Sequence, residues 1–418
     1  MTTALRCRVT GSYLDEFAGV GLAPVWKDAT LARPLFRPRE ELDGLARDIG
    51  RLLRLLREMP ERMFGGSMGD YLDAQGRSPE EIDIILRGSL GHAAAYTRAD
   101  VIDGPDGPRI IELNVGSEVG GLDYGGIARH MLADPAFARF ADSHGLNYVD
   151  PATVMADTLR RTAAEIVGVE NPRVALIEEV NAGRGCQPLV DVLRAKGLDA
   201  WLGELGDLSF RAGKVFAGGG PVDVILRYFC AEHFLDDTLD GDLVDRLVAA
   251  HRNGKTAMFT SLDSAAHDSK SVLALLYSDS IWNRLSESER GLVSRYVPPS
   301  RFMTAADLPR PARRNLVAKP LFGWSGRGVH FGASADDETW ANLLREPRPY
   351  VVQERVDPVA ELVPVPGSAD VAPWLANWGV FVTDDRFCGC FIRAIPATDA
   401  GVIAASNPAW RVGVVFDY

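Results

Sequence analysis

The stretch from Leu316 to Val329, LVAKPLFGWSGRGV, limits the possible folds of this chain more than any other. It begins with a short apolar segment that contains Lys319 near its end. A glycine-rich loop follows and the apolar pattern then resumes, which is typical of a strand, a turn and a returning strand. The loop contains four small residues suited to a tight turn beside a ligand: Gly323, Ser325, Gly326 and Gly328.

This hairpin is interpreted as a flexible flap over nucleotide phosphates. Glycines let backbone N–H groups approach an anion without a Cβ clash, and Lys319 adds a positive charge. The P-loop and dinucleotide motifs do not fit, because the Lys precedes the glycines and a strand follows them. The kinase loop does not fit either, because its Lys lies downstream. The alternative is an ordinary hairpin turn that binds nothing.

A second hairpin is predicted earlier in the chain. Residues 97–102 alternate like a strand, the DGPDG cluster marks a turn, and residues 109–114 form the returning strand. Alternate residues of a strand share a face. Four polar residues thereby fall on faces that a hairpin can bring together: Arg98 and Asp100 on the first strand, Glu112 and Asn114 on the second.

These four side chains have the chemistry of a magnesium and phosphate site. Two carboxylates and an amide are hard oxygen ligands, suited to Mg²⁺ held mostly through substrate phosphates. Arg98 would neutralise phosphate charge that the metal does not reach. The alternative is a solvated hairpin face with ordinary charges. In the loop that follows, Ser117 and Glu118 are candidate contacts to an acceptor substrate, or else plain loop residues.

Other segments have clear secondary-structure signals. Helical spacing of leucines predicts a helix over 39–57, which the stretch 62–72 interrupts, and Ser78-Pro79 begins another that reaches about Leu90. Residues 127–168 are also expected to be helical. Apolar strands alternating with a helix over 170–265 predict a small α/β unit with a parallel sheet.

The last third of the chain adds several charged residues in apolar surroundings. Lys270 begins a helix, where a cation gains nothing from the helix dipole, so it has an anion partner or is a surface lysine. A strand over 350–356 ends in polar residues that include Gln353 and Glu354, and the backbone of such a strand end suits hydrogen bonds to an adenine edge. Arg393 lies in an apolar strand, which predicts an anion or carboxylate partner. Residues 296–315 are interpreted as a connection and 357–373 as an exposed loop, and Cys388 and Cys390 as core cysteines on one strand face.

Composition excludes several classes of protein. The 418 residues are 46% hydrophobic and 24% charged, so more than one folded unit is expected. The net charge of −12 argues against general binding to nucleic acid or anionic membranes. Five scattered cysteines do not form a disulfide framework. No signal peptide or membrane-spanning run is apparent, so a cytoplasmic protein is expected.

Taken in order, these motifs resemble the circularly permuted ATP-grasp ligases, particularly the synthetase domain of glutathionylspermidine and trypanothione synthetases. The resemblance covers roughly residues 90–418. It implies an α+β (α/β) ATP-grasp fold with a small Rossmann-like unit. The implied divisions are a mainly helical segment over 1–90, a permuted part with the metal hairpin over 91–168, a pre-ATP-grasp unit over 169–265, and the ATP-grasp domain over 266–418.

The resemblance also implies roles for individual residues. The metal would be held by Asp100, Glu112 and Asn114. The transferred phosphoryl group would be steadied by Arg98, with Arg393 near the phosphates. ATP would be bound by Lys270, Lys319, the flap glycines with Ser325, and the adenine-side segment at Gln353 and Glu354.

The implied function is an ATP- and Mg²⁺-dependent ligase that joins a small carboxylate to an amine through an acyl phosphate. The family motif E-x-N-A-D-T-P is replaced here by Glu112-Leu113-Asn114-Val115-Gly116-Ser117-Glu118, and no Cys/His amidase domain is apparent. A stand-alone amino-acid or small-peptide ligase is therefore expected, with the oligomeric state open. The alternatives are an ATP-grasp phosphotransferase or ligase with a non-amine acceptor, and a non-catalytic nucleotide-binding protein.

Overall fold

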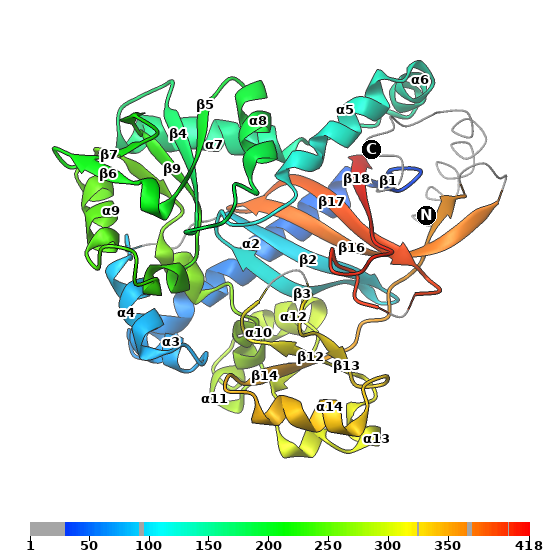
Figure 1. The fold of residues 1–418 in the computed structure, drawn as a ribbon. Coiled ribbons are helices and arrows are strands. Elements are labelled where there is room, and N and C mark those ends of the chain that lie inside the picture. Colours follow the sequence, from blue (N-terminus) through cyan, green and yellow to red (C-terminus); the bar gives the residue numbers. More distant parts are fainter. Residues whose placement is uncertain (1–29, 92–95, 324–325, 366–369, 400) are drawn as a thin grey trace.

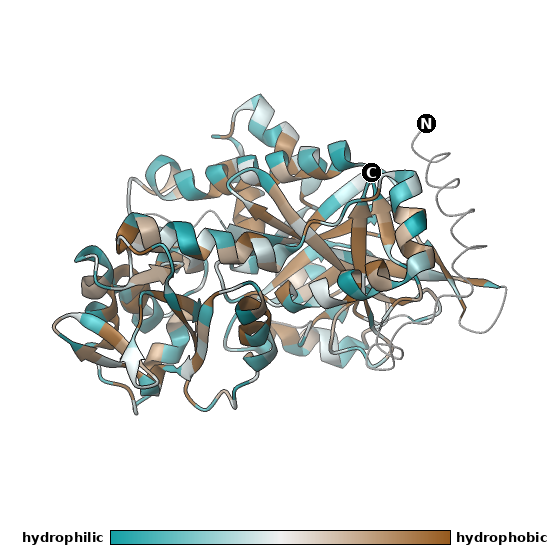
Figure 2. Cartoon of the chain, turned by 90° about the horizontal axis from the view of Figure 1, so that it is seen from above, coloured by the Kyte–Doolittle hydropathy of each residue, from teal (hydrophilic) through white to brown (hydrophobic). Residues whose placement is uncertain are grey.

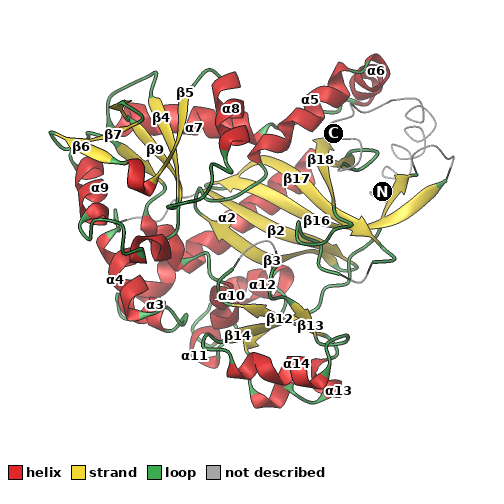
Figure 3. Cartoon of the chain, viewed as in Figure 1, coloured by secondary structure: helices red, strands yellow, loops and turns green. Residues whose placement is uncertain are grey.

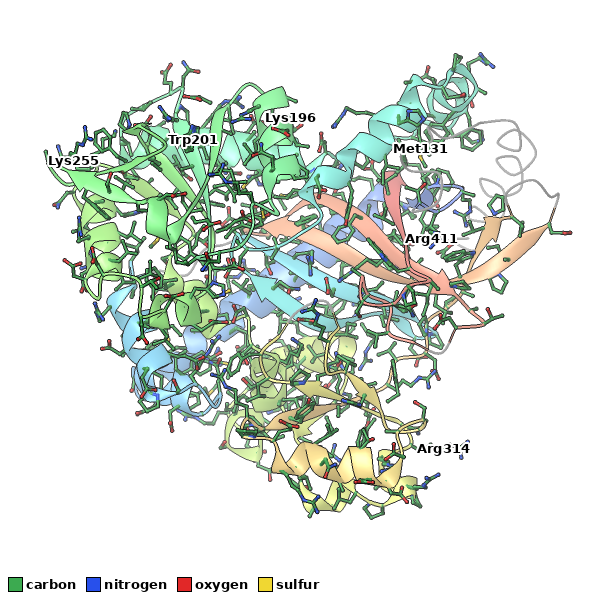
Figure 4. The ribbon with its side chains drawn as sticks, in the orientation of Figure 1. Met131, Lys196, Trp201, Lys255, Arg314 and Arg411 are labelled. Atoms are coloured by element: carbon green, nitrogen blue, oxygen red, sulfur yellow. The ribbon has the colours of Figure 1, made fainter. Side chains whose placement is uncertain are left out.

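The structure is a computed structural model that describes residues 30–91, 96–323, 326–365, 370–399 and 401–418. Strands gather into a central sheet, a parallel sheet and an antiparallel sheet that carries the flap, with a small fourth sheet beside the parallel one (Figure 1). Figure 4 labels Arg411 in the central sheet, Lys255 in the parallel-sheet unit and Arg314 in the flap-sheet unit. The chain is thus a mixed α/β protein built around several sheets.

The central sheet has seven strands in the order β1-β18-β17-β16-β2-β3, with β15 also paired to β16. Its strands are β1 (Leu35–Arg37), β2 (Tyr96–Gly104), β3 (Gly107–Val115), β15 (Glu361–Pro364), β16 (Val371–Thr383), β17 (Arg386–Pro396) and β18 (Arg411–Asp417). Strands from the first third of the sequence therefore pair with strands from its last tenth. The β2–β3 hairpin predicted from the sequence is confirmed, with its turn at Gly104–Gly107.

Helices cover both faces of the central sheet. Helix α2 (Arg39–Met63) buries its row of leucines in one apolar cluster with β16 and β17. It continues past the predicted end at Arg57 because its apolar row continues through Met59. The other face is covered by α5 (Gly125–Ala133), α6 (Pro135–His144) and α7 (Pro151–Ile166). Figure 2 shows apolar strands within and hydrophilic residues on the outer helix surfaces.

The parallel sheet has the order β10-β9-β4-β5, and all of its pairings are parallel. Its elements are β4 (Arg173–Glu178), α8 (Gln187–Ala195), β5 (Asp199–Glu204), β9 (Val224–Tyr228), α9 (Leu243–Arg252) and β10 (Ala257–Phe259). The continuous apolar runs predicted this arrangement correctly. The antiparallel sheet of β6 (Ser209–Arg211), β7 (Lys214–Ala217) and β8 (Gly220–Pro221) was not predicted, because its strands are too short to give a periodic signal.

The flap sheet is antiparallel, in the order β11-β14-β12-β13. Its strands are β11 (Ser300–Phe302), β12 (Leu316–Pro320), β13 (His330–Phe331) and β14 (Tyr350–Glu354). Helices pack around it (Figure 3): α10 (Lys270–Leu276), α11 (Asp279–Trp282), α12 (Glu287–Tyr296), α13 (Arg310–Arg313) and α14 (Asp337–Asn342).

Three local predictions need correction. Residues 296–315 are not a mere connection, since they hold β11 and α13, and 357–373 is not a plain loop, since β15 pairs with β16 there. The helix start predicted at Ser78-Pro79 is confirmed by α4 (Pro79–Arg87) and its Ser78 capping box, although the helix ends before Leu90. The stretch 62–72 contains the short helix α3 (Met68–Asp73). These elements are short or rich in proline and glycine, which weakens their periodic pattern.

The two neighbouring cysteines are buried, as predicted, but they do not share a face. The β16–β17 pairing contains a bulge at this place, and the register of the two strands therefore changes between Phe387 and Cys390. Cys388 belongs to the apolar cluster of α5–α7 and Cys390 to the cluster of α2. Within the described residues, no helix combines the length and apolar character needed to cross a bilayer.

Candidate active site

The register of the β2–β3 hairpin builds the floor of the site. Asp100 is paired with Glu112, and Arg98 with Asn114, so all four side chains project from the same face. Asp100 is 3% exposed and Arg98 9% exposed. The interpretation of this hairpin as a solvated, charged face is therefore wrong, and its polar residues line an interior space.

Two arginines hold Asp100 in its charged form. Arg98 donates from Nε to Asp100 Oδ1 at 2.9 Å, and Arg393 Nη2 on β17 lies 2.6 Å from Asp100 Oδ2. Burial alone would raise the pKa of this carboxyl group, but Arg393 and Arg98 together lower the pKa below its usual range. The carboxylate partner predicted for Arg393 is thus confirmed.

Lys270 connects the floor to the flap. It is the first residue of α10, whose N-cap is Ser269, and it is buried. Its Nζ lies 2.9 Å from Glu112 Oε1 and donates to the Gly323 carbonyl at 2.8 Å. The surface-lysine alternative is therefore wrong, and the anion partner expected for this position is Glu112.

Lys319 approaches the same space from β12. Its Nζ donates to Gln353 Oε1 at 2.7 Å and to the Ile111 carbonyl at 2.9 Å. Gln353 in turn donates to Ser300 Oγ at 3.0 Å, so its side chain orients Lys319 and any contact of this strand with a base would fall to the backbone. Burial is the main cause that lowers the pKa of Lys319 to about 8, with repulsion from Lys270 adding to it.

The predicted flap is a β-hairpin, because β12 and β13 pair antiparallel. Gly323, Gly326 and Gly328 all have positive φ, at 130°, 73° and 71°. A Cβ on Gly326 would lie 2.9 Å from both Val402 and Ala404, so the flap rests directly on this late loop. Ser325 lies outside the described residues.

Floor and flap enclose a cavity of about 170 Å³, named here the flap cavity. Most predicted site residues line it: Arg98, Asp100, Glu112, Asn114, Lys270, Lys319, Gly323, Gly326, Gln353, Glu354 and Arg393. Gly328 is not brought to the flap cavity; a Cβ there would approach Pro320 and Tyr350 instead. The sequence patterns therefore predicted residues that come together from five separate segments.

Several residues of the flap cavity were missed. Asn377 on β16 is 5% exposed, lines the flap cavity, and its Oδ1 has no hydrogen-bond partner among the described residues. The only signal for it was one polar side chain in the apolar strand LANWGVF. Arg327, Asp399 and residues 401–404 also line the cavity, and they carried no signal because their loops have no periodic pattern.

The two residues proposed to contact an acceptor lie elsewhere. Ser117 is fully buried, and its hydroxyl donates to the carbonyls of Arg227 at 2.7 Å and Phe259 at 3.0 Å, so it joins the floor to the parallel sheet. The prediction of a substrate contact for Ser117 is therefore wrong. Glu118 Oε2 lies 2.8 Å from Arg227 Nη2, and Glu118 lines a second space.

This second space, named here the acidic cleft, has a volume of about 400 Å³. It shares Glu112, Asn114, Lys270 and Gly323 with the flap cavity, so the two spaces meet at the Lys270–Glu112 ion pair. Six carboxylates line it: Glu112, Glu118, Glu178, Glu179, Glu232 and Asp268. They come from distant parts of the sequence, which is why no local pattern indicated them.

The floor residues fit a magnesium ion that is held partly by phosphates. Among the described residues no three His, Cys, Asp or Glu side chains cluster as a metal site. The set on the floor instead consists of two carboxylates and the amide of Asn114, and the unsatisfied Oδ1 of Asn377 faces the same cavity. Such hard oxygen donors suit Mg²⁺, which usually takes only one or two protein carboxylates and completes its shell with phosphates and water.

Comparison with known proteins finds a likeness in fold but none in sequence. No family model and no curated protein matches the sequence. Among solved structures, a glutathione synthetase-like effector from Globodera pallida in its apo form is 12% identical, with a TM-score of 0.58, and the match covers 100% of this chain and 98% of that one. The likeness shows a shared fold.

A second solved structure, from Methylobacillus flagellatus and provisionally named a gamma-glutamylcysteine synthetase, is 13% identical and has a TM-score of 0.46. This match covers 94% of this chain and 90% of that one. A TM-score below 0.5 is too low to support an argument about the fold.

Proposed function

We propose that this protein is an ATP-dependent carboxylate–amine ligase with a circularly permuted ATP-grasp fold, which forms an amide bond and releases ADP and phosphate. The observation that carries the proposal is the convergence of Asp100, Glu112 and Asn114 with Lys270 and Lys319 beneath a glycine-rich hairpin. Carboxylate and amide oxygens on one side and two ammonium groups on the other match the needs of a nucleotide triphosphate with its metal.

The chain order supports the permutation. The acids on β2 and β3 precede the flap in sequence, whereas ordinary ATP-grasp enzymes carry them after it. In space β2 pairs with β16, which follows the flap, and β3 pairs with β2. The name of the Globodera pallida neighbour, a glutathione synthetase-like effector, agrees with a ligase that makes peptide-like bonds. The proposed substrates are a small carboxylate and an amine, such as an amino acid or a short peptide.

The chain's residues would activate the carboxylate by positioning and charge. A carboxylate does not react with an amine at neutral pH because oxide is a poor leaving group. Phosphoryl transfer from ATP makes an acyl phosphate. Three cations, Lys270, Lys319 and Arg98, would stabilise the negative charge of the phosphoryl group during this transfer. Asp100 keeps Arg98 and Arg393 aimed at the flap cavity.

Asp100, Glu112 and Asn114 would hold Mg²⁺, which when bound supplies charge neutralisation at the phosphate oxygens. The flap would exclude water, since an acyl phosphate otherwise hydrolyses. Its contact with Val402 and Ala404 provides the closed position. The tetrahedral oxyanion formed on amine attack would receive hydrogen bonds from Arg98 or from flap N–H groups.

The proposal is tested by incubating the full-length protein with ATP, Mg²⁺ and pools of carboxylic acids, amino acids, short peptides and amines. Release of ADP and phosphate that requires both a carboxylate and an amine is the expected result, and mass spectrometry of the mixture identifies the amide. Formation of AMP and pyrophosphate would contradict the acyl-phosphate route. ADP release that requires a hydroxyl acceptor would indicate a phosphotransferase, and ATP binding without turnover would indicate a non-catalytic protein.

A further inference from the structure

We infer that the acidic cleft admits the amine in its ammonium form and that Asp268 removes its proton before the attack on the acyl phosphate. This inference rests on the proposed function. It concerns a residue that plays no part in the ATP site described above, and a space that opens onto that site at Lys270 and Glu112.

The charge of the acidic cleft selects between the two substrates. Among the described residues, six carboxylates and two cationic side chains, Arg77 and Lys270, line the cleft, and Arg227 pairs with Glu118 from outside the lining, so negative charge is in excess. Lys270 is already paired with Glu112, and Arg77 lies near Asp268 and Glu232. A second carboxylate ligand would meet unfavourable charge in this space, whereas an ammonium group would be attracted.

A buried carboxylate also lacks a donor in this cleft. Glu178 is 5% exposed; its Oε1 accepts a hydrogen bond from the Cys186 N–H at 3.0 Å, while its Oε2 has no hydrogen-bond partner among the described residues. A buried acceptor without a donor is costly, so such groups usually meet a ligand or water. An ammonium group has three N–H donors and can satisfy this oxygen.

The position of Asp268 suits proton transfer from such a ligand. It stands two residues before Lys270, so it lies near the junction of the acidic cleft and the flap cavity. Arg77 holds it by donating from Nη2 to Asp268 Oδ1 at 3.1 Å, and Arg77 is itself fixed by the Ala265 carbonyl and by stacking over Phe322. The Asp268 side chain is still 25% exposed, which leaves it open to a ligand and to solvent.

The surroundings of Asp268 also bring its pKa close to neutral pH. Burial is the main cause that raises its pKa to about 7; Arg77 and Arg227 lower the pKa, while Glu118 and Glu232 raise it further. A general base works best when its pKa lies near the working pH. Glu118 is less suitable because its side chain is only 14% exposed, and Glu112 because it is proposed to hold the metal.

The proposed step balances as follows. The ammonium group gives one proton to the Asp268 carboxylate, which passes it to solvent. The free amine lone pair then forms the C–N bond at the acyl carbon, and the C–O bond to phosphate breaks with its electron pair on the leaving phosphate. The nitrogen then loses a second proton, which the departing phosphate takes up. The products are an amide and hydrogen phosphate.

The test compares two nucleophiles in Asp268→Asn: the best amine found in the pool assay, and hydroxylamine, which is mostly unprotonated at neutral pH and needs no base. We expect kcat/KM for the amine to fall by about 100-fold or more, and its rise with pH near 7 to disappear. Hydroxamate formation should stay within about threefold of the wild-type rate. Asp268→Glu, which keeps a carboxylate, should recover part of the amine reaction.

The control is Glu179→Gln, which removes one negative charge from the same cleft and should keep the rise with pH. An unchanged pH profile in Asp268→Asn would overturn the inference, and so would an equal loss of the hydroxylamine reaction, because that would place Asp268 in an earlier step. If the wild-type protein forms neither ADP nor hydroxamate, the proposed ligase function itself fails.

Discussion

The flap cavity and the acidic cleft share an ion pair but have opposite charge. Six cationic side chains line the flap cavity beside four acidic ones, whereas six acidic side chains line the acidic cleft beside two cations. The boundary between them is Lys270 with Glu112. A reaction that joins two charged substrates gains from this arrangement, because each side attracts one charge and repels the other. Under the proposed function, this difference would direct the phosphates to the flap cavity and the amine to the acidic cleft.

Removing a cation from the flap cavity gives the largest expected effect. Lys319→Ala should lower ADP formation by about 10³-fold, because a buried ammonium beside the transferred phosphoryl group is lost. The matched control is Lys255→Ala, at an exposed lysine of the parallel-sheet unit that is labelled in Figure 4. Steady-state kinetics measures both variants, and similar rates for the two would remove Lys319 from the phosphate site.

The flap gives the next largest effect. Gly326→Ala should lower kcat/KM for ATP by about 100-fold, because a Cβ at φ 73° would be strained and would collide with Val402 and Ala404 when the flap is closed. It should also increase the share of ATP hydrolysed without amide formation, since water would reach the acyl phosphate.

The control for this variant is Gly219→Ala. Gly219 has a similar φ of 78°, but a Cβ there would meet nothing within 4 Å. The ratio of phosphate to amide product, followed in both variants, separates a closure defect from simple backbone strain. Equal ratios in both would contradict the role of the flap as a barrier to water.

The sequence predicted the parts of the site that rest on strand periodicity. The alternation in TRADVI and RIIELN identified the shared face of Arg98, Asp100, Glu112 and Asn114, because a period of two requires it. Lys270 and Lys319 were found from a helix start and a strand end. What could not be predicted depends on tertiary contacts: the orphaned Asn377, the loop at 401–404 beneath the flap, and the acidic cleft, whose carboxylates come from four different parts of the chain.

The same limit explains the error at Ser117. Its sequence neighbours, Gly116 and Glu118, gave the pattern of a ligand-binding loop, and the structure has a loop at this place. However, the parallel sheet packs against this loop and uses the Ser117 hydroxyl for its own carbonyls, which no local pattern reveals. The placement of one sheet beside another decides whether a polar loop residue meets a ligand or the protein itself.

A smaller effect is expected at Phe391, whose ring lies beside two arginines of the flap cavity. The guanidinium groups of Arg98 and Arg393 lie 5.7 Å and 5.6 Å from the ring centre of Phe391. Phe391→Leu should lower kcat by about tenfold, because the two arginines lose the cation–π support that sets their direction. Phe387→Leu is the control. Phe387 lies on the same strand but outside the flap cavity, and the Arg39 guanidinium lies 5.4 Å from the centre of its ring. Equal losses in both variants would show a folding defect rather than a positioning role.

The smallest expected effect is a pH dependence confined to the flap cavity. Lys319 has a pKa of about 8 in the free protein, so its ammonium fraction falls as the pH rises through that value. ATP needs the charged form, so KM for ATP should rise about threefold between roughly pH 7.5 and 8.5. kcat should change less, because bound phosphates stabilise the ammonium group and raise its pKa in the complex. Lys319→Arg keeps its charge throughout and should abolish this rise.

If KM for ATP is flat across this range in the wild-type protein, then Lys319 does not meet the phosphates as a titrating cation. The contrast between the two spaces would then depend on Lys270 and the arginines alone.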